Sequence, residues 1–213
     1  MKRIGRLHVL TDVVLQCRYS HVELARMAIS GGADTIQFRQ KSGSTRSMIE
    51  TAREMKEVCR KAGVAFIVND RIDVALASEA DGVHLGQEDF PIPLARSLLG
   101  EDRIVGGSAS TLEEAVRCRL AGADYVGFGP VCYTASKEDA GPVSGIALLR
   151  EAVQKVPLPV VAIGGINAGN VGEVMGTGVW GVAVISSVCC QDDPQDAARC
   201  LWELLAPWRS ERG

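Results

Sequence analysis

The run Gln37-Phe38-Arg39-Gln40-Lys41 places two cations close together in a β-rich stretch of the chain. Side chains along a strand alternate between its two faces, so Gln37, Arg39 and Lys41 share the face opposite to Phe38. Cations on a face that the fold covers are costly unless they meet anions. The pattern therefore indicates a phosphate or diphosphate site, structural ion pairs with nearby acids, or a strand register shifted by one residue.

Acidic residues follow the next two β-rich runs of the chain. Asn69 and Asp70 come after residues 65–68, and Asp89 comes shortly after residues 82–85. Such residues can simply cap the helix that follows. At the mouths of neighbouring strands, however, two carboxylates can hold Mg²⁺, with water and phosphate oxygens filling its remaining positions. The second interpretation fits a diphosphate bound by Arg39 and Lys41.

A long polar loop follows the β-rich run at residues 125–129, and it is rich in groups that bind phosphate. Thr134 and Ser136 offer hydroxyls and Lys137 offers a positive charge. Polar loops punctuated by Gly and Pro often carry function, although a solvent-exposed loop without function is the plain alternative.

Two later loops have backbone features of a phosphate site. Gly164-Gly165 follows the run at residues 159–163, and Ile185-Ser186 ends the last run. Backbone N–H groups in the loop between a strand and the following helix commonly bind phosphate. Paired glycines also allow a close backbone approach, and a tight turn is the alternative explanation.

These candidate residues must be positioned by the β-rich runs that alternate with amphipathic segments along the chain. The predicted strands are Leu7–Leu10, Thr35–Arg39, Ala65–Val68, Gly82–Leu85, Ile104–Gly107, Tyr125–Gly129, Pro159–Ile163 and Gly181–Ile185. Strands separated by helices predict parallel βαβ units. Eight such units predict a single α/β domain over residues 1–213, a (βα)8 TIM barrel with parallel strands. A doubly wound open sheet is the alternative.

Local signals support this division of the chain. Ser44 and Gly63 bound a predicted helix, and Thr111 with Glu114 has the pattern of a capping box at the start of another. A Gly-Ala-Asp motif or a relative precedes several strands, as in the tripeptides ending at Asp34, Asp81 and Asp124. This recurrence indicates internal repetition.

Composition excludes several classes of function. The chain has 213 residues, 46% of them hydrophobic and 23% charged, with a net charge of −3. This balance does not favour a nucleic-acid or membrane-surface binder. Apolar runs fall short of the roughly 18 residues that a membrane span needs. Seven cysteines without zinc-site spacing indicate a cytoplasmic protein with free thiols. His84 is predicted to be a satisfied core histidine, and Cys132 lacks the basic neighbour of a nucleophile.

The chain resembles the thiamine-phosphate synthase family over nearly its whole length. The matching segments include Leu10-Thr11-Asp12, Gln37-x-Arg39-x-Lys41, Val68-Asn69-Asp70-Arg71-x-Asp73, the stretch 80–89, Gly107-Ser108, the stretch 122–130, the 134–137 loop and Ala162-Ile163-Gly164-Gly165-Ile166. The resemblance implies a TIM barrel and an Mg²⁺-dependent condensation. In it, a thiazole phosphate displaces pyrophosphate from hydroxymethylpyrimidine diphosphate by a dissociative path, giving thiamine phosphate.

The resemblance also implies a role for each candidate residue. Diphosphate would be held by Arg39, Lys41, Asn69 and Lys137, Mg²⁺ by Asp70 and Asp89, the pyrimidine and its leaving group by Gln37 and Ser108, and the thiazole phosphate by Thr134, Ser136, Gly165, Ile185 and Ser186. Of these, Arg39, Lys41, Ser108 and Lys137 are predicted to act in catalysis. The implied partners are the two phosphorylated substrates, with no nucleic acid or membrane, and a homo-oligomer is compatible with the chain.

The chain departs from the family pattern at four places. Gln40 stands where Glu is usual, Cys132-Tyr133 replaces an aromatic–Pro pair, and Ser136 replaces Thr but keeps the hydroxyl. Trp180 ends a Val-Trp pair where Ala-Asp is common, and it could cover an apolar surface or a subunit interface. The second departure lies beside the predicted thiazole site and bears on substrate preference.

Three alternative functions share the predicted barrel. A thiazole tautomerase would rely on a His just after the fifth strand, where this chain has Ser108-Ala109-Ser110-Thr111. A non-catalytic sensor of thiamine phosphate would not need two metal carboxylates. A sugar-phosphate isomerase or epimerase would need a general base placed for proton abstraction, and no Glu or His is clearly set for that task.

Overall fold

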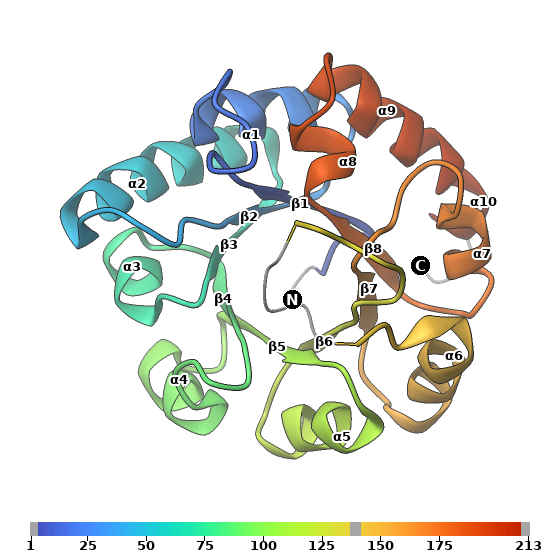
Figure 1. Ribbon diagram of the computed structural model, residues 1–213. Coiled ribbons are helices and arrows are strands. Elements are labelled where there is room, and N and C mark those ends of the chain that lie inside the picture. The colour runs from blue at the N-terminus through green and yellow to red at the C-terminus, as the bar shows by residue number, and fades with distance from the viewer. Residues whose placement is uncertain (1–3, 137–141, 210–213) are drawn as a thin grey trace.

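The computed structural model describes residues 4–136 and 142–209, which form a closed barrel of eight parallel strands in the order β1 to β8 (Figure 1). The strands are β1 (Leu7–Thr11), β2 (Thr35–Phe38), β3 (Ala65–Asn69), β4 (Gly82–Leu85), β5 (Ile104–Ala109), β6 (Tyr125–Phe128), β7 (Val160–Ile163) and β8 (Gly181–Val184). The predicted (βα)8 TIM barrel is confirmed, and each predicted strand lies within two residues of its observed ends.

Helices surround the barrel and connect its strands (Figure 1). They are α1 (His21–Ser30), α2 (Thr45–Ala62), α3 (Ile72–Ala77), α4 (Ile92–Leu99), α5 (Leu112–Leu120), α6 (Gly145–Lys155), α7 (Val171–Met175), α8 (Ser186–Cys189), α9 (Pro194–Leu204) and α10 (Ala206–Arg209). The predicted caps are present: Ser44 caps α2, left-handed Gly63 ends it, and Thr111 forms a capping box with Glu114. No helix among the described residues is both long and apolar enough to cross a membrane.

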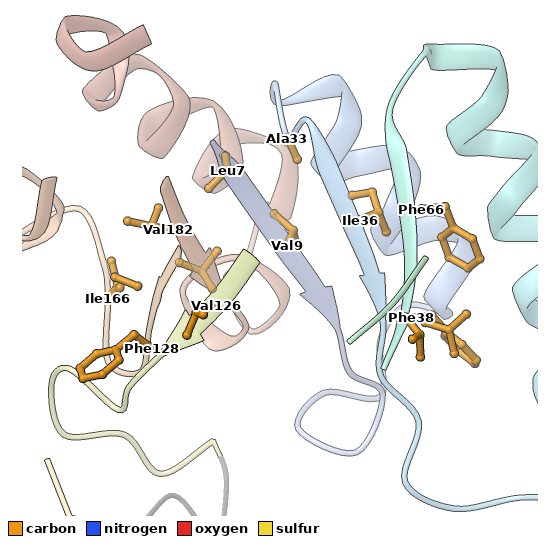
Figure 2. Close-up of a cluster of buried hydrophobic side chains, with 14 of the residues drawn as sticks. Leu7, Val9, Ala33, Ile36, Phe38, Phe66, Val126, Phe128, Ile166 and Val182 are labelled. Atoms are coloured by element: carbon orange, nitrogen blue, oxygen red, sulfur yellow. The ribbon is translucent and has the colours of Figure 1, made fainter. Parts of the chain in front are cut away.

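Alternation along the strands divides the apolar side chains into two groups. Val9, Ile36 and Phe38 face outward and pack with the helices in the main core (Figure 2). A smaller cluster inside the barrel includes Leu10 and Tyr125. Parallel strands covered by helices bury both faces, which explains their apolar character. Polar inward side chains occur at both ends of the strands: His8 and Thr35 bond to Gly5 at the amino-terminal end, and Gln37 lines the cavity at the carboxyl end.

The recurring Asp residues join neighbouring strands at the amino-terminal end of the barrel. Asp34, Asp81 and Asp124 each accept a backbone N–H at the start of the preceding strand, from Leu7, Phe66 and Val105 respectively, each at 2.8 Å. These N–H groups need partners because they are buried where a strand begins. The motif seen in the sequence is therefore a repeated structural device.

Trp180 stands before β8 at the corresponding place, and it closes the same end of the barrel. Its Nε1 donates to the carbonyl oxygens of Ile4 and Gly5, and the Arg6 guanidinium lies 4.2 Å from the centre of its ring. The indole also packs against the apolar cluster inside the barrel. The apolar surface that Trp180 covers thus belongs to the barrel interior.

Candidate active site

A cavity of about 400 Å³ lies at the carboxyl ends of the strands and reaches into the barrel. All predicted site residues within the described ranges line it: Gln37, Arg39, Lys41, Asn69, Asp70, Asp89, Ser108, Thr134, Ser136, Gly165, Ile185 and Ser186. Lys137 lies outside the described residues. Residues far apart in the sequence converge here because parallel strands in a barrel share one carboxyl-terminal face.

Arg39 and Lys41 lie just beyond the end of β2, and both line the cavity and have acidic partners. Arg39 Nη1 donates to Asp12 Oδ2, and Lys41 Nζ donates to Asp70 Oδ2 at 2.5 Å. The Asp12 side chain is 2% exposed and that of Arg39 is 13% exposed. The sequence indicated structural ion pairs as an alternative to a phosphate site, and these ion pairs exist. Because both cations also line the cavity, an anionic ligand bound there would contact the same cations.

Asp12 is a residue to which the sequence assigned no role. Its Oδ1 accepts the backbone N–H groups of Val14 at 2.8 Å and Leu15 at 3.0 Å, while Oδ2 accepts from Arg39. One carboxylate thus shapes the β1–α1 loop and fixes the guanidinium that lines the cavity. In the sequence, the only hint of this role was that Asp12 is an acidic residue directly after the first strand.

Asp70 and Asp89 form a carboxylate pair at the ends of β3 and β4. Burial raises the pKa of Asp89, the neighbouring Asp70 carboxylate raises it further, and the Gly86 N–H, 2.6 Å from Asp89 Oδ2, partly opposes this. Two negative charges side by side favour a bound proton or cation between them. Hard oxygen ligands of this kind suit Mg²⁺.

The capping explanation for this pair is wrong. The caps of α3 and α4 are Arg71 and Pro91, and neither helix has a side-chain capping bond. Asp70 has φ of 65°, a left-handed conformation that Asp adopts more often than most residues other than Gly. Within residues 4–136 and 142–209, no cluster of three or more His, Cys, Asp or Glu could hold a metal. A metal here would therefore take at most two protein carboxylates, with other oxygens completing its shell.

The hydroxyl groups of the β6–α6 loop meet the start of α8. Ser136 Oγ donates to Ser186 Oγ at 3.0 Å, and the Ser136 N–H donates to Thr134 Oγ1 at 3.2 Å. Both loops also line the cavity. Three hydroxyls and the first turn of a short helix thus gather on the side of the cavity away from the carboxylate pair.

The paired glycines after β7 allow a close contact between two loops. Gly164 and Gly165 have φ of 99° and 66°, and side chains rarely adopt such values. A Cβ at Gly164 would lie 2.5 Å from Pro130 Cα, and one at Gly165 would lie 2.3 Å from the Tyr133 carbonyl oxygen. Glycine is required here because the β6–α6 loop crosses this turn, in addition to any approach by a ligand.

His84 has a hydrogen-bond partner on each ring nitrogen, as predicted for a satisfied histidine, and it also lines the cavity. Nδ1 lies 2.8 Å from the Tyr125 hydroxyl and Nε2 lies 2.9 Å from Ser108 Oγ. Cys132 lies near the paired glycines. Burial and the Glu173 charge raise the pKa of its thiol, which disfavours a nucleophilic thiolate.

A family profile described as thiamine monophosphate synthase matches residues 7–188. The chain belongs to the thiamine monophosphate synthase family. It is 54% identical to the thiamine-phosphate synthase of Methanocella arvoryzae, over 95% of this chain and 96% of that protein. It is 52% identical to the protein of that name from Salinibacter ruber, over 92% of this chain and 86% of the relative. Membership identifies an enzyme of the transferase class that acts in thiamine biosynthesis.

One solved structure agrees with this family, and a second shares the fold. The thiamine phosphate pyrophosphorylase from Pyrococcus furiosus superimposes with a TM-score of 0.88 and 44% identity, covering 95% of this chain and 96% of that one. An N-acetylmannosamine-6-phosphate 2-epimerase from Clostridium perfringens has a TM-score of 0.67 at 21% identity, covering 94% and 93% of the two chains. The second likeness shows a shared barrel fold alone.

Proposed function

We propose that this family member condenses 4-amino-2-methyl-5-hydroxymethylpyrimidine diphosphate with a thiazole phosphate, giving thiamine phosphate and pyrophosphate with the help of Mg²⁺. The observation that carries the proposal is the placement of a carboxylate pair beside two cations at one cavity mouth. Lys41 already contacts Asp70, and Asp89 adjoins that carboxylate. This combination suits a diphosphate that shares a divalent cation with the protein.

The pyrimidine diphosphate is the larger of the two ligands to be positioned. Arg39, Lys41 and Asn69 would bind its diphosphate, and Lys137 is proposed for the same task on its sequence position. Gln37, whose side chain is buried, would pair with the pyrimidine edge. Ser108 would donate to the leaving group. Each of these groups can donate a hydrogen bond, which suits an acceptor-rich substrate.

Mg²⁺ held by Asp70 and Asp89 would neutralise charge on the diphosphate as it departs. The raised pKa of Asp89 supports this assignment, since the pair is unfavourable with two charges and no cation. Among the described residues, these two carboxylates are the ligands that the protein would supply to Mg²⁺. Its remaining oxygen ligands would come from water and substrate.

The thiazole phosphate would bind on the opposite side. Thr134, Ser136 and Ser186 supply hydroxyls, and backbone at Gly165 and Ile185-Ser186 lies at the usual phosphate position of such barrels. This orientation would point the thiazole ring at the methylene carbon of the first substrate and would hold the reacting atoms together.

The proposed reaction breaks the C–O bond between the methylene carbon and the diphosphate, which leaves with the electron pair. A pyrimidine-stabilised carbocation remains, and the lone pair of the thiazole nitrogen forms the new C–N bond. That nitrogen carries no proton to lose, so the chemistry needs no general base. The cavity supplies the cations and hydrogen-bond donors that this path requires, among them Arg39, Lys41 and Asn69, which suit binding of the departing diphosphate.

Pyrophosphate release tests the proposal. Purified protein is given both substrates with Mg²⁺, then each substrate alone, then both with EDTA. Release that requires both substrates and Mg²⁺ is expected. A protein that binds either phosphate compound but releases no pyrophosphate would instead be a sensor, and the proposal would be abandoned.

A further inference from the structure

Three side chains that all line the cavity form a hydrogen-bonded row across β5. The Tyr125 hydroxyl lies 2.8 Å from His84 Nδ1, and His84 Nε2 lies 2.9 Å from Ser108 Oγ. Tyr125 is 2% exposed and His84 is 8% exposed, so neither ring depends on water for its position. The row ends on a hydroxyl that lines the cavity.

The strand register explains how residues on β4 and β6 can touch across the strand between them. His84 pairs with Gly106 on β5, and Gly106 pairs with Tyr125 on β6. Gly106 has no side chain, and a Cβ there would lie 2.3 Å from the Tyr125 ring and 2.5 Å from His84 Nδ1. The two rings therefore fill the space that any larger residue would occupy.

A second glycine also leaves space for the imidazole. Gly127 pairs with Ser108, and a Cβ at Gly127 would lie 2.8 Å from His84 Cε1. The Tyr125 and His84 rings are also in contact, with centroids 5.3 Å apart. Packing thus holds the His84 ring in one orientation, with one nitrogen toward each hydroxyl.

The buried phenol determines the direction of the hydrogen bonds. Burial raises the pKa of Tyr125, so its hydroxyl keeps its proton. His84 Nδ1 is the hydrogen-bond partner that the described residues supply for that hydroxyl. If Nδ1 carried a proton, the phenolic O–H would be buried without an acceptor, which is costly. Nδ1 therefore accepts, and the neutral imidazole carries its proton on Nε2.

The same logic orients Ser108. With the proton on Nε2, His84 donates to Ser108 Oγ, whose own proton is then directed elsewhere. Ser108 lines the cavity, so that proton is available to an acceptor bound there. With the opposite tautomer, Ser108 would donate to His84 and offer the cavity a lone pair instead.

We propose that Tyr125 and His84 are positioning residues that make the Ser108 hydroxyl a hydrogen-bond donor to the departing diphosphate. This rests on the proposed function, in which that oxygen gains negative charge as the C–O bond breaks. A donor fixed in advance stabilises such charge without reorganising during the reaction. The three side chains act as one unit, since each sets the direction of the next.

The tautomer is measured first, on the ligand-free wild-type protein with ¹⁵N-labelled histidine. Long-range ¹H–¹⁵N spectra distinguish a protonated from an unprotonated ring nitrogen. The proposal expects His84 with bare Nδ1 and protonated Nε2, and Tyr125→Phe should shift the proton toward Nδ1. A wild-type spectrum with protonated Nδ1 would overturn the proposal, whether or not the enzyme makes thiamine phosphate.

A double-mutant cycle then tests the link to catalysis. Tyr125→Phe should lower kcat by about 10- to 100-fold, the range for residues that orient others, with little change in KM for the pyrimidine diphosphate. In a Ser108→Ala background the same change should have little further effect. Equal losses in both backgrounds would show a merely structural role and overturn the proposal. Tyr19→Phe, which removes a phenol outside the cavity lining, serves as the control.

The two proposals fail in different ways. Wild-type protein that releases no pyrophosphate from the two substrates defeats the synthase proposal, while the tautomer still decides the hydrogen-bond direction. If Tyr125→Phe does not fold, His84→Gln replaces it in the cycle with Ser108→Ala, and it should show the same loss of additivity.

Discussion

Asp89→Asn should lower activity strongly while leaving the fold as stable as before or more so. The asparagine Oδ1 can still accept the Gly86 N–H that Asp89 accepts at 2.6 Å. The substitution removes the negative charge and little else. It therefore separates the proposed role in cation binding from a role in shaping the β4–α4 loop.

The expected stability follows from the direction of the pKa shift. Burial and then Asp70 raise the pKa of Asp89 in the folded protein. Because the folded-state pKa is raised, the contribution of Asp89 to stability is fully present below the ordinary pKa of Asp. It is lost as pH rises through the pKa in the folded state. At pH 7 the Asp89 charge therefore costs stability, which Asn restores.

The magnitude of this gain is small because the pair is partly solvated. Two like charges about 4 Å apart in a water-like environment repel by about 1 kcal/mol. Lys41, which contacts Asp70, offsets part of that cost. A gain of up to about 1 kcal/mol corresponds to a rise in Tm of about 2–4 °C for a chain of this length.

The expected loss of activity is much larger. Losing one of two cation ligands should remove about 3 kcal/mol of transition-state stabilisation, which is roughly a 100-fold fall in kcat/KM. The assay is pyrophosphate release across a Mg²⁺ titration, and the variant should also need more Mg²⁺. Asp73→Asn is the matched control. Asp73 is exposed and paired with Arg71. The activity of Asp73→Asn should therefore stay within about twofold of the wild-type value.

Two results would refute this reasoning. An Asp89→Asn protein that loses stability in step with activity would place Asp89 among the structural residues. A variant that keeps wild-type activity and Mg²⁺ dependence would remove it from the cation site. In either case the carboxylate pair would no longer support the proposed use of Mg²⁺.

Two further predictions concern stability. Gly165→Ala should cost about 3 kcal/mol in urea unfolding, since it combines a left-handed backbone with a Cβ 2.3 Å from a carbonyl oxygen. Gly63→Ala, left-handed but with open space around it, should cost only about 1 kcal/mol; equal costs would contradict the contact argument. Burial, opposed by the Asp12 charge, lowers the pKa of His21 from 6.5 to about 4. Because the folded value is the lower one, stability is lost as pH falls below 6.5, by about 2 kcal/mol at pH 5. The free energy of unfolding is measured at pH 7 and at pH 5 for the wild-type protein and for His21→Gln. The variant should lose less stability between the two pH values, and an equal loss in both proteins would rule out His21 as its source.

Much of the fold could be read from local patterns. Short β-rich runs separated by helical segments recur eight times, and the capping box at Thr111 and the terminator Gly63 are local features set by nearby residues. Repeated βαβ units predict parallel strands that are buried on both faces, which a barrel and a doubly wound open sheet share. The pairing of β1 with β8 in the structure decides for the closed barrel. The face of Gln37, Arg39 and Lys41 followed from alternation along one strand.

The location of the candidate site was also accessible from the sequence, although its contacts were not. Residues just after successive parallel strands must meet at one face, so the predicted set within the described residues lines one cavity. Which acid meets which cation depends on strand register. Asp12 and Arg39 are 27 residues apart and pair because Thr11 and Phe38 are neighbours across β1 and β2.

The Tyr125–His84–Ser108 row shows most clearly what only the tertiary structure decided. The sequence indicated a satisfied histidine at position 84 but could not supply its partners. Those partners depend on Gly106, where the absence of a side chain lets β4 and β6 residues meet across β5. The strands themselves follow from local periodicity, which is encoded within a few residues. The contact between His84 and Tyr125 over Gly106 depends on the register of β4, β5 and β6 together. That register is set by the closure of the barrel.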